Sequence, residues 1–231
     1  MRLDKYLSNA KIGSRKEVGK WIRKGLVTVN GGVEKNPKTD VSYHDEIYFK
    51  DDLVKLEEFI YIMMNKPKGV ISSTEDGPSQ TVIDLIDHPQ KDELFPVGRL
   101  DKDTTGLMFI TNDGKLAHRI LSPKNEHFKT YHVTLRDQVS LSDIKRLEEG
   151  IELSDFTTKR AKAELVSEKT VLLSISEGKF HQVKRMFEAR GKKVVYLKRT
   201  SFGNLPLDES LEEGEYKELS ESELAVLYKN F

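Results

Sequence analysis

Residues 98–107 read GRLDKDTTGL, a polar stretch that leads into an apolar segment ending at Thr111. The pattern predicts a loop rich in Asp, Thr and Gly, followed by a buried strand over residues 106–111. Loops that lead into a core strand are places where a rigid scaffold presents reactive groups. Asp101, beside Arg99, is therefore a candidate functional carboxylate. The alternative from these residues alone is a structural turn, in which Asp101 or Asp103 accepts hydrogen bonds from backbone amides.

Strands and helices alternate irregularly on both sides of this stretch. The apolar run Phe59–Met64 predicts a buried strand that ends in the turn-forming residues 65–69. Further strands follow closely on one another, which indicates hairpins and an α+β domain whose mixed, mostly antiparallel sheet is flanked by helices. The predicted strands also cover residues 69–73, 129–136, 161–167, 170–176, 193–198 and 215–219, and the predicted helices cover residues 81–86, 115–121, 140–149, 180–190 and 221–229.

The N-terminal segment predicts a compact module of its own. Apolar residues at helical spacing predict a short amphipathic helix over residues 2–9. Ser14 and Glu17 have the spacing of a capping box, so a second helix should begin at Ser14. A strand over residues 26–29 leads into Asn30-Gly31, a strong signal for a hairpin turn.

Charge is unevenly distributed along the chain, although the formal net charge is zero. Residues 1–30 hold eight basic and two acidic residues, whereas residues 203–231 hold eight acidic and two basic ones. An RNA-facing surface at one end and a solvated acidic surface at the other would give this distribution. Ordinary surface helices with salt bridges would give it as well, so charge alone leaves both interpretations open.

The composition excludes several classes of protein and site. A hydrophobic share of 37% and a charged share of 33% describe a globular protein with a core. The chain has no cysteine, which excludes disulfides and thiolate zinc sites and favours the cytoplasm. Its six histidines show no metal-ligand spacing, so we expect no metal. No segment approaches the roughly 20 apolar residues of a membrane span, and we expect neither a membrane anchor nor a secretory signal.

The segment RLDKYLSNAKIGSRKEVGKWIRKGLVTVNG, residues 2–31, resembles the S4 RNA-binding domain. The resemblance covers about residues 1–48 and implies a small S4 (αL) domain over residues 1–50. The charged residues 51–58 are then expected to be an irregular linker, and residues 59–231 a second domain. A row of cations on one rigid helix suits phosphate contacts. The residues expected to bind RNA there are Arg15, Lys16, Lys20, Arg23 and Lys24.

Residues 98–107 resemble the catalytic motif of the pseudouridine synthases, which has the form GRLD-x-x-(T/S)-x-GL. The resemblance implies that Asp101 is the essential catalytic residue. It also implies that Arg99 contacts RNA and helps to open the duplex around the target. Residues 129–131, KTY, resemble the K-x-Y strand of the same family. Tyr131 would then be the active-site tyrosine that stacks on the target base.

Residues 176–186, SEGKFHQVKRM, resemble the EG-x-x-HQ-x-(R/K) motif of the same family. The basic residue after this HQ-x segment is Lys184, which would pair with Asp101, while Arg185 is an alternative partner for the same role. Ile175 matches the apolar residue that packs near the flipped base. The resemblance implies a structural role for His181 rather than general-base chemistry.

The combination of an S4 domain, a compact synthase domain and the HQVKRMF sequence resembles the small-subunit (16S) ribosomal RNA type of this family. That resemblance implies the isomerisation of one uridine of bacterial 16S rRNA, uridine-516, to pseudouridine. The reaction breaks the N-glycosidic bond and forms a C5–C1′ bond, and it needs neither a cofactor nor a metal. The expected partner is 16S rRNA or a small-subunit assembly intermediate, and the protein is expected to be a monomer.

Three alternatives stay open from the sequence. The first is a pseudouridine synthase that acts on 23S rRNA. The second is a non-catalytic RNA-binding factor that uses the S4 module, although it leaves the ordered motifs of the second domain unexplained. The third is a glycosidase-like carboxylate pair formed by Asp101 and Asp103, whose separation would have to reach roughly 5–10 Å.

Overall fold

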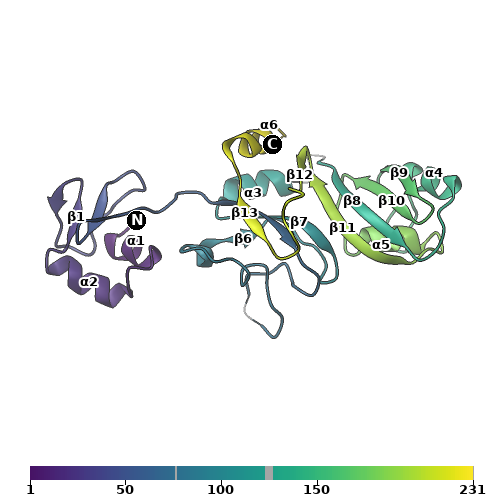
Figure 1. The fold of residues 1–231 in the computed structure, drawn as a ribbon. Coiled ribbons are helices and arrows are strands. Elements are labelled where there is room, and N and C mark those ends of the chain that lie inside the picture. Colours follow the sequence, from purple (N-terminus) through teal and green to yellow (C-terminus); the bar gives the residue numbers. More distant parts are fainter. Residues whose placement is uncertain (76, 123–126, 231) are drawn as a thin grey trace. The chain divides into compact units, whose positions relative to one another are not determined.

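The computed structural model describes residues 1–75, 77–122 and 127–230. The chain divides into two compact units, which are described separately. The small unit comprises Met1–Ile60 and the later segment Ile86–Leu94, and the large unit comprises the remainder. Figure 1 shows the elements of both units along the chain.

The small unit packs two helices against a short sheet of strand order β2-β1-β3-β4. Apolar side chains from both helices and the sheet form its core, among them Leu7, Ile22 and Ile47, each 0% exposed. Its elements are α1 Leu3–Asn9, α2 Arg15–Arg23, β1 Val27–Val29, β2 Gly32–Val33, β3 Ile47–Phe49, β4 Asp52–Val54 and the 3-10 helix η1 Lys91–Glu93.

Local sequence signals explain these elements. Ser14 caps α2 through a capping box with Glu17, as predicted. Asn30 and Gly31 both have positive φ values, 51° and 81°, in the tight turn between β1 and β2. Two-residue hairpin turns of this kind need left-handed backbone at both positions, which Asn and Gly adopt at low cost.

Residues 51–58 are less irregular than their composition suggested. They contain β4, which pairs antiparallel with β3. Val54 and Leu56 are buried in the core of the small unit. Alternating charged residues hide these two apolar positions in the sequence, because a three-residue strand is too short to show a period. The position of the boundary between the two domains stays a prediction.

The large unit is built on one mixed sheet, so the predicted α+β class is confirmed. The strand order is β13-β5-β7-β11-β8-β10-β9, with β6 paired to β7 and β12 paired to β11. The β7–β11 pair is parallel and the other named pairs are antiparallel. The bounds are β5 Tyr61–Lys66, β6 Phe95–Pro96, β7 Thr105–Thr111, β8 Lys129–Leu135, β9 Lys162–Ser167, β10 Thr170–Ile175, β11 Val194–Phe202, β12 Leu205–Pro206 and β13 Tyr216–Glu218.

Four helices in the described part of the large unit pack against this sheet: α3 Gly114–Leu121, α4 Leu141–Glu149, α5 Gln182–Glu188 and α6 Glu221–Asn230. Side chains of α3 and α6 join the apolar core on β7, where Leu107 is 0% exposed. Figure 1 shows α4 beside β9 at the opposite end of the sheet from β13. Helix α5 follows β10 and contacts β11, which brings it next to the strands in the middle of the sheet.

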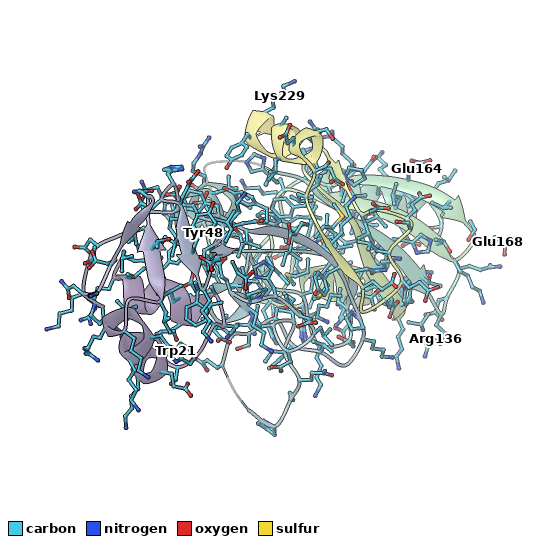
Figure 2. The ribbon with its side chains drawn as sticks, turned by 60° about the vertical axis from the view of Figure 1, so that its left-hand side comes forward. Trp21, Tyr48, Arg136, Glu164, Glu168 and Lys229 are labelled. Atoms are coloured by element: carbon cyan, nitrogen blue, oxygen red, sulfur yellow. The ribbon has the colours of Figure 1, made fainter. Side chains whose placement is uncertain are left out.

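Strand β9 forms one edge of the sheet and carries charged side chains. Glu164 and Glu168, on and just after β9, are exposed and project from the ribbon, as does Arg136 nearby (Figure 2). Charges on an edge strand oppose its pairing with a second chain.

Two predicted elements of the large unit are wrong. Residues 69–73 do not form a strand, and only Ile71 makes an isolated bridge, to Thr81. Residues 81–86 form turns rather than a helix. Side-chain hydrogen bonds explain the second error, because Asp84 accepts from the Thr81 amide while the Thr81 hydroxyl accepts from the Asp84 amide. Such local bonds compete with helical ones.

Among the residues that the structure describes, no helix has the length and apolar character needed to cross a bilayer.

Candidate active site

Asp101 lies in the loop before β7 and pairs with Lys184 from the first turn of α5. Lys184 Nζ donates to Asp101 Oδ2 at 2.8 Å and to Asp103 Oδ1 at 2.6 Å. The side chains of Asp101 and Lys184 are 26% and 23% exposed, so water screens their attraction only in part. The structure therefore brings together two motifs that lie more than 80 positions apart.

The charges of this cluster support one another. Burial alone would lower the pKa of Lys184, but its hydrogen bonds to Asp101 and Asp103 outweigh burial and raise that pKa. Burial would raise the pKa of Asp103, and the hydrogen bond from Lys184 outweighs it and lowers that pKa. Lys184 is consequently a cation and Asp103 an anion at neutral pH.

The loop that carries Asp101 is anchored by Lys66, the last residue of β5. Lys66 is 0% exposed, and its Nζ donates to the carbonyl oxygens of Asp101 at 3.1 Å and Thr104 at 2.8 Å. Burial lowers the pKa of Lys66 to about 8. Ser72 adds a second anchor, because its hydroxyl donates to the Leu100 carbonyl and accepts from the Leu100 amide, both at 3.0 Å.

Sequence patterns do not indicate these two anchors. They predict only a turn over residues 65–69 and place Ser72 in a strand. One signal was present, since Lys66 closely follows the apolar run Phe59–Met64, where a buried charge needs compensation by hydrogen bonds. Nothing in the sequence indicates that this compensation comes from carbonyl groups 35 and 38 residues later.

A pocket opens beside Asp101, with walls from neighbouring strands of the sheet. Tyr131 on β8, Ile175 on β10 and Leu197 on β11 line it. Tyr131 is 7% exposed and Ile175 is 3% exposed, so a flat apolar group could be enclosed here. Thr104 also lines the pocket, and its buried Oγ1 has no hydrogen-bond partner among the described residues.

Phe180 and His181 flank Asp101 on the loop before α5. Their rings stack with centroids 3.8 Å apart and planes 17° from parallel. His181 has left-handed backbone, with φ 50° and ψ 27°, and its Nε2 lies 3.7 Å from Asp101 Oδ1. Phe180 is 74% exposed, which is unusual for so large an apolar ring.

Gly106 is the second glycine of the GRLDKDTTGL stretch, and the packing of two strands explains why glycine is needed there. Its φ is +99°, and a Cβ placed there would lie 2.2 Å from the Arg199 carbonyl oxygen and 2.7 Å from the Arg199 amide nitrogen. Both contacts are with backbone atoms of β11, which cannot move aside without breaking the sheet. The parallel β7–β11 pair therefore requires glycine at the start of β7.

The sequence pattern of the family described as RNA pseudouridylate synthase matches residues 60–189, and that of the S4 domain matches residues 1–47. The first match spans more than half of the chain and includes Asp101, Tyr131 and Lys184. The chain belongs to the RNA pseudouridylate synthase family. Both resemblances found in the sequence are thereby confirmed, and the protein is an enzyme of this family with an N-terminal S4 domain.

Relatives of this synthase match along nearly their whole length. The uncharacterized RNA pseudouridine synthase YtzG of Bacillus subtilis is 49% identical, over 98% of each chain. The ribosomal small subunit pseudouridine synthase A of Haemophilus influenzae is 46% identical, over 99% of this chain and 100% of its own. A solved crystal structure of a pseudouridylate synthase is 45% identical with a TM-score of 0.71, and the match covers 98% of this chain and 99% of that one.

The structure separates Arg185 of the synthase from the role expected of Lys184. Arg185 pairs with Asp155, donates to Ser154 Oγ at 3.3 Å, and lies 5.3 Å from the centroid of the Phe156 ring. Lys184 alone of these two neighbours contacts Asp101, because successive helical residues point about 100° apart. Arg99 lines the pocket of Asp101 together with Tyr131 and Ile175.

The basic residues predicted in the S4 domain are all exposed on or just after α2. Arg15, Lys16, Lys20 and Arg23 line one hollow of the small unit, whereas Lys24 does not. Arg15 also pairs with Asp4 at 3.0 Å. The hollow thus combines several exposed cations on one helix, which is the arrangement expected of a phosphate-binding surface.

Within residues 1–75, 77–122 and 127–230, no group of three or more His, Cys, Asp or Glu side chains is arranged to hold a metal ion.

Proposed function

We propose that this synthase converts a uridine of small-subunit ribosomal RNA to pseudouridine with Asp101 as its catalytic carboxylate. Relatives named ribosomal small subunit pseudouridine synthase A, 41–46% identical over nearly the full length, support the substrate class. The observation that carries the catalytic assignment is the contact of Asp101 with Lys184 at 2.8 Å, at a pocket that Tyr131 and Ile175 also line.

The reaction is an isomerisation in which every atom of the uridine is retained except for an exchanged proton. The N1–C1′ bond breaks and its electron pair leaves with the uracil. In one route Asp101 attacks C1′ and forms an ester bond, which breaks when C5 of the rotated uracil attacks C1′. In the other route the C2′ proton is lost as uracil departs, giving a glycal, and C2′ regains a proton when C5 bonds to C1′. In both routes the proton on C5 is then lost and N1 gains one. Both routes need a carboxylate beside the ribose, and Lys184 places a positive charge against the carboxylate of Asp101.

The proposed substrate must leave its stack before Asp101 can reach its sugar, and flipping a base costs a few kcal/mol. The exposed ring of Phe180 offers a stacking surface beside Asp101. Arg99 lines this region as well, and the cations of α2 provide further contacts for RNA. These contacts would return the energy that flipping requires.

The target nucleotide, the partner and the location are also proposals. By family resemblance we propose uridine-516 of 16S rRNA as the target, in free rRNA or in a small-subunit assembly intermediate. The proposed partner is 16S rRNA or that assembly intermediate, with the protein acting as a monomer. The proposed location is the cytoplasm, where bacterial ribosomes are assembled.

Replacement of Asp101 tests the catalytic assignment. We expect Asp101→Asn to reduce pseudouridine formation in 16S rRNA on the order of 10³-fold or more, because an amide cannot replace an essential carboxylate. Affinity for the RNA should stay within about twofold, because a neutral isostere removes no contact with phosphates. The measurements are position-specific mapping of pseudouridine and equilibrium binding to the same RNA.

Asp103→Asn is the matched control, because Asp103 touches the same lysine but its side chain is 60% exposed. We expect this control to keep most of the activity. Normal turnover by Asp101→Asn would refute the catalytic assignment, and a modified uridine found only in large-subunit rRNA would refute the substrate assignment.

A further inference from the structure

A second pocket lies next to the pocket of Asp101 in the large unit, with a volume of about 380 Å³. We name it the cationic pocket, after the side chains of Arg99, Lys129, Lys179 and Arg199 that line it. It shares Arg99, Tyr131, Gly178 and Lys179 with the pocket of Asp101. A nucleotide whose base occupied one pocket would therefore have its strand close to the other.

Lys129 and Arg199 are the two deep cations of the cationic pocket, and neither has a carboxylate partner among the described residues. Arg199 is 3% exposed, and its Nε donates to the Leu107 carbonyl at 2.7 Å. Lys129 is partly buried, and its Nζ donates to the His127 carbonyl at 3.3 Å. In the part of the chain that the structure describes, neither cation has a carboxylate oxygen within 4.0 Å.

The ring of Phe202 is the shared neighbour of these two cations. Lys129 Nζ lies 5.3 Å and the Arg199 guanidinium 5.6 Å from its centroid. Contacts of this kind between a cation and an aromatic ring are weaker than an ion pair with a carboxylate, so they compensate burial in part. Glu177 also lines the pocket, but its Oε1 already accepts from the Lys159 amide at 2.8 Å and from Gln182 Nε2 at 2.7 Å.

The electrostatic consequence is visible at Lys129. Burial and the charge of Arg199 lower the pKa of Lys129 to about 8, while Glu177 raises it weakly by comparison. Two mutually repelling, partly desolvated cations destabilise a fold unless something compensates them. An anionic ligand would supply that compensation and would gain strong, charge-assisted hydrogen bonds in return.

We propose that the cationic pocket binds a backbone phosphate of the RNA strand, at the target uridine or at the nucleotide next to it. This inference rests on the proposed function, because it places the phosphate relative to a uridine at Asp101. Lys129 and Arg199 provide the deep contacts, and Arg99 and Lys179 provide contacts shared with the neighbouring pocket. The pocket thereby fixes the position of the strand while the base is turned.

Neutral linkages in the RNA test this assignment without altering the fold. The probe is a synthetic fragment of 16S rRNA containing uridine-516, in which single phosphodiesters around the uridine are replaced by methylphosphonates. Binding is measured with full-length Asp101→Asn protein, so that the RNA stays unmodified. We expect one neutral linkage, at or next to the uridine, to weaken binding about tenfold or more, since hydrogen bonds to charged groups are stronger than those between neutral groups.

Lys129→Met in the same background assigns that linkage to the pocket. The variant should bind the unmodified fragment about tenfold more weakly, and the sensitive methylphosphonate should then cost it little further affinity. The slope of log affinity against log salt should fall by roughly 0.7, the value for one phosphate contact on a single strand. Lys129→Arg should restore the affinity and the slope, because it keeps the charge.

Lys145→Met is the matched control, because it removes one positive charge from a side chain that is 76% exposed and lies outside both pockets. We expect it to leave the methylphosphonate profile unchanged. Thermal unfolding of each variant verifies that the protein is folded in the binding assays.

Three results would overturn the inference. The first is that no linkage near the uridine is sensitive. The second is that the methylphosphonate lowers RNA affinity equally in the Asp101→Asn protein and in the same protein carrying Lys129→Met. The third is tight binding of inorganic phosphate to the protein alone, without competition by RNA, which would identify the pocket as a site for free phosphate. Each concerns binding only, whereas the catalytic proposal fails on turnover by Asp101→Asn.

Discussion

Lys184 and Lys129 line adjacent pockets around Tyr131, and their surroundings are opposite. Lys184 lies between two carboxylates, which raise its pKa. Lys129 lies beside an arginine and an aromatic ring, and burial with the charge of Arg199 lowers its pKa to about 8. The fold already uses the charge of Lys184 to hold Asp101 and Asp103. Among the described residues no carboxylate lies within 4.0 Å of Lys129, so its charge is available for an anionic ligand.

The comparison of the two pockets distinguishes polar side chains whose partners lie within the protein from polar side chains that are available to a ligand. In the pocket of Asp101 the charge of Lys184 is matched by two carboxylates, while the neutral hydroxyl of Thr104 has no hydrogen-bond partner among the described residues. In the cationic pocket Lys129 and Arg199 donate to carbonyl groups, and no described carboxylate lies within 4.0 Å of either. A base with neutral polar edges fits the first pocket and a phosphate fits the second, which is the division expected for one nucleotide and its backbone.

Removal of the satisfied cation should have the largest effect. Lys184→Met leaves Asp101 and Asp103 without a cation between them, so we expect activity on the rRNA fragment to fall by about 10²-fold or more. Lys184→Arg keeps the charge and should lose much less. The measurement is single-turnover pseudouridine formation. If the activity of Lys184→Met stayed within threefold of wild type, the proposed difference between the roles of Lys184 and Lys129 would be wrong.

Thr104→Val should have an intermediate effect. It replaces the unsatisfied hydroxyl with a methyl group of similar size, so the pocket keeps its shape. If the hydroxyl bonds the substrate, activity should fall roughly fivefold, because such a bond contributes about 1 kcal/mol, and Thr104→Ser should recover most of it. An unchanged rate in Thr104→Val would show that this hydroxyl does not bond the substrate.

The smallest expected effect is on stability. Between about pH 8, the pKa of folded Lys129, and its usual 10.5 the unfolded chain binds more protons than the folded one. As pH rises through this window, Lys129 loses its proton and the free energy of unfolding of the wild type therefore increases. Lys129→Met shows no such increase. At pH 7 the variant should be more stable by about 1 kcal/mol, allowing for partial exposure of the lysine.

Urea denaturation at pH 7 and at pH 10 measures this difference. The advantage of Lys129→Met should shrink at the higher pH. Lys66 has a similarly lowered pKa but is present in both proteins, so its contribution cancels. A difference that is the same at both pH values would mean that Lys129 is not destabilised by its charge.

Much of the fold follows from local sequence signals. The capping box of Ser14, the hairpin turn at Asn30-Gly31 and the buried run before Lys66 each lead to the observed element. These signals act over a few residues and reflect backbone geometry. The two-residue strands β6 and β12 escaped prediction because so short a segment has no period, and residues 81–86 because side-chain bonds decide their turn.

The candidate site divides in the same way. Family motifs pointed to Asp101, Tyr131 and Lys184, and the structure brings these three residues to one pocket. The anchoring by Lys66 and the lack of a described carboxylate near Lys129 are different in kind, because they depend on which groups surround a side chain in space. Lys129 belongs to the K-x-Y motif, yet only the absence of a nearby carboxylate in the described residues distinguishes it from an ordinary surface lysine.

The segment Ile86–Leu94 has a consequence for dissecting the molecule. It belongs to the small unit, where Gln90 bonds the backbone of Glu57 and Lys11 pairs with Asp92. The chain therefore passes between the units three times, near residues 60, 85 and 94. A single protease cut at the first passage would not release the N-terminal piece as a free fragment. A chimaera that exchanged residues 1–60 alone would leave behind a strip of the original module, so S4 grafts need both segments to come from one parent.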